Sequence, residues 1–113
     1  MRLQVQDLWS PDLDPPSTGE PEDNLDFDIQ AQVALGMVDQ VGREVFSLRV
    51  CSPTALARTE AGTFVTNTLV VEQFSWAALR GRLEKLLAQC NGSRDWDEAI
   101  RRLSGCLRHN DAA

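Results

Sequence analysis

The stretch Val45-Phe46-Ser47-Leu48-Arg49-Val50-Cys51-Ser52-Pro53 fixes a corner of the fold, because it joins a strand directly to a helix. From Phe46 to Val50, apolar and polar residues alternate, which is the period of a strand buried on one face only. Ser52 is a typical helix N-cap, and Pro53 fits the first helical position, where its missing N–H costs no hydrogen bond. The sequence therefore predicts a strand over residues 45–51 and a helix that begins at Pro53.

Two segments before this stretch show the same alternation. Residues 2–8 contain Leu3 and Val5 between polar neighbours, and Asp26–Leu35 is the clearest strand signal in the chain. The predicted inward positions of the second segment are Phe27, Ile29, Ala31, Val33 and Leu35. Gly36 and Gly42 bracket the connection to the next strand, which fits a wide antiparallel hairpin.

The segments after Pro53 read as helix, strand and two helices. The first helix should run to about Ala61, and a strand should lie within residues 64–74, centred on Leu69-Val70-Val71. Either Leu69 and Val71 or Val70 could point inward. Ser75 should cap a helix that ends at Asn91-Gly92. The helical apolar stripe of this segment consists of Trp76, Leu79, Leu83, Leu86, Leu87 and Cys90.

A third helix should follow near the end of the chain. Asp95 and Glu98 have the spacing of a capping box. The apolar stripe behind them consists of Trp96, Ile100, Leu103 and Leu107. We expect the tail, residues 109–113, to fray.

These elements predict an α+β fold in one domain, residues 1–113. The chain has 113 residues, 42% of them apolar, which suffices for one core without disulfides or metal. We expect a mainly antiparallel sheet of about four strands with two to three helices on one face, in the order β-β-β-α-β-α-α. The helix after Pro53 could link parallel or antiparallel neighbours.

The charge is unevenly distributed along the chain. The formal net charge is −6, yet residues 1–42 carry nine acidic residues against Arg2 alone. Nucleic-acid binding needs a basic stripe, which the acidic half does not offer, so we expect no nucleic-acid partner. Such a surface either favours a cationic partner or serves only to keep the protein soluble.

The acidic charge gathers in the Pro-rich loop 10–24 and on the polar side of the strand that follows it. Antiparallel sheets tolerate one wet face, and a flat amide-rich face can hydrogen-bond a protein. Trp9, beside this loop, either covers the edge of the core or forms an exposed interface anchor. The predicted partner-binding residues are Trp9, Asp12, Asp14, Glu20, Glu22, Asp23, Asp26, Asp28, Gln30 and Gln32.

The sequence contains no recognisable reaction centre. His109 is the only histidine and lies near the chain end, where a general base would not be held in place. The three cysteines read as small apolar residues, and the acidic loop lacks the ligand spacing of a calcium loop. No Gly-rich phosphate loop occurs. We therefore predict no catalytic residue, metal or cofactor; a small hydrolase that uses the clustered carboxylates is a weaker alternative.

Three segments follow one another along the chain: Leu8–Asp14, which contains Ser-Pro-Asp-Leu-Asp; Phe46–Pro53, a strand that ends in Val-Cys-Ser-Pro; and Leu69–Leu79, a strand followed by the start of a helix. In this order they resemble the immunity protein 8 family of bacterial polymorphic toxin systems, with its early Ser-Pro-Asp-x-Asp signature, its central Val-Cys-Thr/Ser-Pro strand, and its last strand and long helix. The family tends to carry a tryptophan shortly after the Cys-Thr/Ser-Pro turn, where this chain has Ala55 and Leu56. If the family tryptophan contacts the toxin, this chain recognises its target differently.

The resemblance implies a non-enzymatic protein that binds a cognate toxin tightly and blocks it. Many such toxins are cationic, so an anionic inhibitor would capture them faster through long-range attraction. The first residues lack the apolar run of a signal peptide, and no stretch approaches a membrane span. We therefore expect a cytoplasmic protein without a membrane partner. The alternative is an acidic adaptor or nucleic-acid mimic that binds a basic protein other than a toxin.

Overall fold

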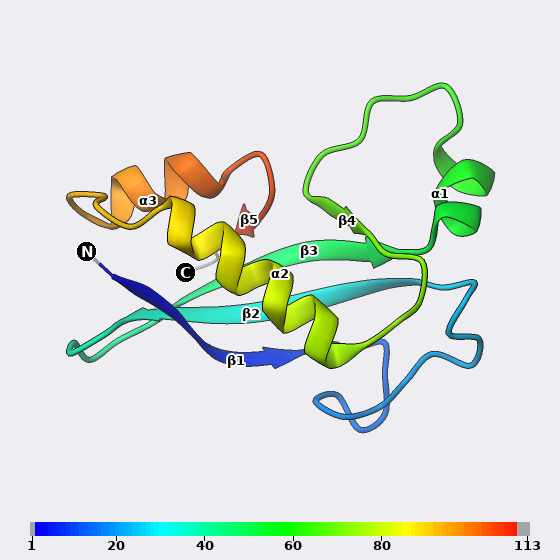
Figure 1. Ribbon diagram of the computed structural model, residues 1–113, viewed down its shortest axis with the longest axis horizontal. Helices are drawn as coiled ribbons and strands as arrows, with labels where there is room; N and C mark the ends of the chain where they lie inside the picture. Colours follow the sequence, from blue (N-terminus) through cyan, green and yellow to red (C-terminus); the bar gives the residue numbers. More distant parts are fainter. Residues whose placement is uncertain (1, 111–113) are drawn as a thin grey trace.

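The computed structural model describes residues 2–110 as a mixed sheet with helices against it (Figure 1). The strands are β1 (Leu3–Trp9), β2 (Asp28–Met37), β3 (Glu44–Cys51), β4 (Thr68–Val70) and β5 (Arg108–His109). The helices are α1 (Pro53–Glu60), α2 (Trp76–Gln89) and α3 (Trp96–Leu103). This is the α+β fold that the sequence predicts, with one additional short strand at the end.

The strand β3 is the centre of the sheet. It pairs antiparallel with β2 along its whole length, and β2 pairs antiparallel with β1. On its other edge β3 meets β4, which is parallel, and β5, which is antiparallel. The Arg49 N–H donates to the Asn67 carbonyl at 2.9 Å where β4 begins. The helix after Pro53 thus links parallel neighbours.

One face of the sheet is apolar and carries α2 and α3, as Figure 1 shows for α2 crossing the strands. All five inward positions predicted for β2 are buried, and they pack in one core with residues of both helices. The helical contribution consists of Leu79, Leu83 and Leu87 from α2 and Ala99 and Leu103 from α3. Burying one such aliphatic side chain contributes about 1.5–3 kcal/mol.

The helices begin where the sequence places their caps. The Ser52 hydroxyl accepts the Ala55 N–H, and the Ser75 hydroxyl accepts the Ala78 N–H, each at 3.2 Å. The Asp95 carboxylate accepts the Glu98 N–H at 2.9 Å. Side chains therefore satisfy backbone donors that the first helical turns leave free.

The strand β2 begins at Asp28 rather than at Asp26, which is a correction of its predicted start. Asp28 pairs with Cys51, the last residue of β3, and the Ser52 N–H then donates to the Phe27 carbonyl at 3.0 Å. Because Ser52 starts a helix, Asp26 has no strand residue opposite it and lies in a bend.

The prediction that the tail frays from His109 is wrong for its first residues. His109 belongs to β5, its ring packs 5.1 Å from the ring of Phe46, and its Nε2 lies 2.9 Å from Oε2 of Glu44. The Asn110 N–H donates to the Val45 carbonyl at 2.9 Å. This half of the β3 edge is free because β4 pairs only with residues 49–51. Residues 111–113 lie outside the described residues.

The choice of inward residues in β4 is decided by the structure. Leu69 and Val71 pack against the core, whereas Val70 is 41% exposed. The strand is short, and the residues before it, from Ala61 to Asn67, form a loop that carries Phe64 at the surface.

Candidate functional site

The acidic loop 10–24 is fastened to the edge of β2. The buried Ser10 hydroxyl donates to the Gln30 carbonyl and accepts the Asp12 N–H at 3.2 Å, while an Asp12 carboxylate oxygen accepts the Gln30 N–H at 2.8 Å. β1 pairs with residues 32–37 of β2 only, so Ser10 and Asp12 satisfy the backbone groups of Gln30 in its place. The Ser-Pro-Asp segment is therefore structural.

Two further contacts keep this loop compact. Leu13 is 7% exposed and belongs to the core cluster. The Trp76 indole N–H donates to the Gly19 carbonyl at 2.8 Å, which ties the loop to the start of α2. A Cβ on Gly19 would lie 2.7 Å from the Pro15 carbonyl oxygen, so only glycine fits this turn. The loop presents its remaining carboxylates from a fixed backbone.

Five of the predicted site residues line one open hollow with a volume of about 480 Å³, here called the acidic hollow. They are Asp12, Glu22, Asp23, Asp26 and Asp28, and the rest of the lining consists of Leu13, Pro21, Phe27 and Ile29. Loop 10–24 supplies one side, and the start of β2 with its preceding bend supplies the other. The surface is anionic over an apolar floor, which suits a cationic side chain with an aliphatic stem.

The other predicted site residues lie outside this hollow. Asp14 and Glu20 are exposed elsewhere on the loop. The register of β1 and β2 shifts between Val5 and Asp7, so Trp9 lies opposite Gln32, half-buried on the face of the sheet away from α2 and α3. We call this second face the polar face. It also carries Asp28, Gln30, Ser47 and Arg49.

The amide of Gln32 is occupied by the end of the chain. Its Oε1 accepts the Asn110 Nδ2–H at 2.8 Å, and the Ser47 hydroxyl oxygen lies 3.0 Å from the same Oε1. Gln32 therefore fastens β5 to the sheet, whereas Gln30 extends from the polar face with its side chain exposed.

Arginines already neutralise two carboxylates of the acidic hollow. Arg49, 14% exposed, forms a two-point ion pair with Asp28 and reaches Glu60 of α1 at 3.0 Å. The hydrogen bond with Asp28 raises the pKa of the Arg49 guanidinium, so it stays charged. Arg58 pairs with Asp26, and its hydrogen bond lowers the pKa of that carboxyl. The anionic character of the hollow thus depends on the three carboxylates that have no arginine partner within residues 2–110, Asp12, Glu22 and Asp23. Asp12 already accepts the Gln30 N–H, which leaves Glu22 and Asp23 as the two available to a partner.

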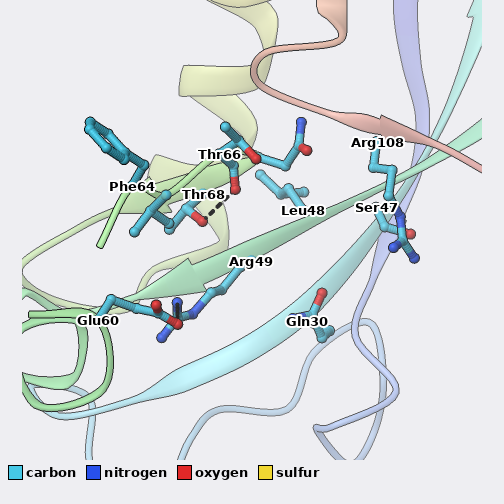
Figure 2. Close-up of a pocket in the computed structure, with 11 residues that line it drawn as sticks. Gln30, Ser47, Leu48, Arg49, Glu60, Phe64, Thr66, Thr68 and Arg108 are labelled. Atoms are coloured by element: carbon cyan, nitrogen blue, oxygen red, sulfur yellow. Dashed lines mark hydrogen bonds and ion pairs between the residues drawn. The ribbon is translucent and has the colours of Figure 1, made fainter. Parts of the chain in front are cut away.

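A second hollow, of about 430 Å³, lies beside the first on the polar face, and we call it the polar groove (Figure 2). It is lined by Gln30, Ser47, Leu48, Arg49, Glu60, Phe64, Val65, Thr66, Asn67, Thr68 and Arg108. Sequence reasoning included only Gln30 among these. Because a strand was expected within residues 64–74, Phe64 was not predicted as a surface residue. The available signal was an aromatic residue two positions after Gly62, which ends the helix.

The described residues hold no further arrangement that points to chemistry. Within residues 2–110, no group of three or more His, Cys, Asp or Glu side chains could hold a metal ion. None of the described helices combines the length and the apolar character needed to cross a membrane.

Comparison with known proteins identifies the class to which this chain belongs. The model of the family Immunity protein 8 matches residues 3–109. The chain therefore belongs to the immunity protein 8 family. No curated protein and no solved structure gives a significant match.

Proposed function

We propose that this protein is a cytoplasmic immunity protein that binds a cognate toxin and neutralises it by steric occlusion. Membership of the family supports the immunity function, and the acidic hollow is the surface that we propose contacts the toxin. Its carboxylates project from a fastened loop and a strand end, so the surface loses little conformational freedom on binding. The protein needs no chemical step in this role, because blocking access to the toxin is sufficient.

The electrostatic part of the proposal rests on Glu22 and Asp23. Both are exposed, and in residues 2–110 no ion pair engages either side chain. Positive charge on a toxin would accelerate its encounter with this protein at low ionic strength. At about 0.1 M salt, attraction between charges more than about 10 Å apart is largely screened. Association of the two proteins should therefore slow steeply as salt is added.

Co-expression tests the proposal. The product of the adjacent reading frame should be toxic when expressed alone and harmless when this chain is present, and the two should copurify. A toxicity that persists, with no complex formed, would overturn the function. Copurification with a basic protein that is not toxic would instead favour the acidic adaptor.

Charge-neutral variants test the contact surface. Glu22→Gln with Asp23→Asn should lower the association rate about tenfold at low salt and leave stability nearly unchanged. Asp39→Asn with Glu84→Gln is the matched control, because it also removes two charges; Asp39 lies in the β2–β3 turn at the other end of the sheet (Figure 1), and Glu84 is an exposed residue of α2. Asn tolerates the positive φ of 73° of Asp39. Equal rates for all three proteins would remove charge steering from the proposal.

A further inference from the structure

Phe64 is a large aromatic residue that the fold leaves entirely in water. Its side chain is 106% exposed, and Val65 beside it is 38% exposed. Figure 2 shows its ring pointing away from Arg49 and Gln30, two other residues that line the polar groove. Phe64 therefore contributes no packing to the core.

The loop that carries Phe64 is nevertheless held on both sides. Before it, the Thr63 hydroxyl donates to the Glu60 backbone carbonyl at 2.8 Å, and the Glu60 carboxylate accepts a hydrogen bond from Arg49 at 3.0 Å. After it, the Asn67 N–H donates to the Gly105 carbonyl at 3.2 Å, and the Asn67 side-chain amide donates to the Ser104 carbonyl at 2.8 Å.

The backbone of Asn67 lies in the left-handed region, with a φ of 53°. Asn adopts this conformation more readily than most residues other than glycine. The two hydrogen bonds to Ser104 and Gly105 hold the turn in place. Several hydrogen bonds therefore order the loop of residues 61–67, although the side chain of Phe64 in this loop packs against no other residue.

The polar groove and the acidic hollow form one continuous surface. Arg49 lines the groove, Asp28 lines the hollow, and the two side chains bind each other. A single protein could cover both, with cationic groups over Glu22 and Asp23 and an apolar pocket at the position of Phe64. This charge pattern favours a basic protein as the occupant over a second copy of this chain, whose net charge is −6.

We propose that Phe64 is the apolar anchor of the toxin interface and inserts into a pocket on the toxin, while the groove beside it meets polar groups of the toxin. This inference rests on the proposed function and adds a second contact of different chemistry. Binding energy concentrates in a few aromatic residues that become fully desolvated, and a preordered loop lowers the entropic cost of burying one. The acidic hollow then governs the rate of encounter, and Phe64 governs how long the complex lasts.

The test compares Phe64→Ala with Val41→Ala in the full chain, with the protein encoded by the adjacent reading frame as the probe. Val41 is also 106% exposed but lies in the β2–β3 turn, away from the groove. Because both side chains are in water, neither truncation should alter folding. Phe64→Ala should accelerate dissociation about 30-fold at every salt concentration, with little change in the association rate. Val41→Ala should match the wild type.

The outcomes separate this inference from the function on which it rests. If the wild-type chain binds the probe and Phe64→Ala dissociates at the same rate, Phe64 is not the anchor, but the immunity function stands. Equal weakening by both truncations would also overturn it, because the effect would not be specific to the groove. A wild-type chain that fails to bind the probe would overturn both proposals. Partial recovery by Phe64→Leu would support an apolar pocket on the toxin.

Discussion

Arg49 and Asp28 form a two-point ion pair between β3 and β2, with Nε to Oδ1 and Nη2 to Oδ2 both at 2.8 Å. The two residues are diagonal neighbours on the polar face, since Arg49 lies opposite Gln30 and Asp28 lies opposite Cys51. Arg49 also donates to Thr59 and Glu60 of α1. One side chain therefore joins the start of β2, the end of β3 and the last turn of α1.

Replacing Arg49 should destabilise the protein. Arg49→Ala leaves Asp28 and Glu60 without their cation and removes the contacts of Thr59 and Glu60 that join the last turn of α1 to the sheet, so we expect a loss of about 1–2 kcal/mol in the free energy of unfolding. Urea denaturation followed by circular dichroism measures it. Arg58→Gln is the control: Arg58 is 59% exposed in its pair with Asp26, and its loss should matter much less. An equal loss of unfolding free energy in both variants would show that the burial of Arg49 adds nothing to the stability that its ion pairs contribute.

Removing the Ser10 hydroxyl should loosen the acidic loop. Ser10 is fully buried, and Ser10→Ala leaves the Gln30 carbonyl and the Asp12 N–H without their partner. We expect a loss of about 1–2 kcal/mol in stability. Hydrogen exchange should accelerate at residues 11–16 and at Gln30. The control is Ser17→Ala, an exposed position in the same loop, which should change stability by less than about 0.5 kcal/mol.

Acidification should destabilise the fold through its paired carboxylates. The hydrogen bond from Arg58 lowers the pKa of Asp26 below its ordinary value of 3.8, and the one from Arg94 lowers that of Glu98 below 4.5. Because these pKa values are lower in the folded state, the unfolded chain binds more protons. The stabilisation is complete above about pH 5 and is lost as pH falls through the folded pKa values.

Urea titrations at about pH 6 and about pH 3 would measure this loss. The Arg58→Gln, Arg94→Gln double variant should lose less stability between these two pH values than the wild type. A loss of the same size in both proteins would contradict the contribution of these ion pairs.

The three cysteines should differ in reactivity. Cys51 and Cys90 are buried, and burial raises the pKa of both thiols, whereas Cys106 is exposed. Since the thiolate is the nucleophile, the folded protein should react rapidly at one thiol only. Mass spectrometry after brief iodoacetamide treatment should locate this label on Cys106, and all three should react in denaturant. Cys106→Ser should abolish the rapid phase; rapid labelling of Cys51 would contradict its burial.

Local patterns predicted the parts of the fold that depend on near neighbours. The alternation in β2 and β3 defines a buried face whatever lies opposite, and Ser52, Ser75 and Asp95 cap helices through contacts three residues away. Such contacts are visible in sequence because their spacing is fixed by helix and strand geometry.

The candidate site was only partly predictable, because several of its contacts join residues that are far apart in the sequence. The acidic residues of loop 10–24 are obvious from composition, and five of the predicted residues do share the acidic hollow. Composition does not say that Asp12 serves the backbone of Gln30, or that Arg58 and Arg49 neutralise Asp26 and Asp28. These contacts join residues separated by 18, 32 and 21 positions.

The fold class, the helix starts, the buried face of the central strands and the acidic character of one end follow from the order of the residues. The parallel pairing of β4 with β3, the fifth strand that holds His109 and the place of Phe64 in the lining of the polar groove appear only in three dimensions. Local periodicity reports which face of a segment is apolar. Which partner covers an edge or a loop depends on segments that meet only after the chain has folded.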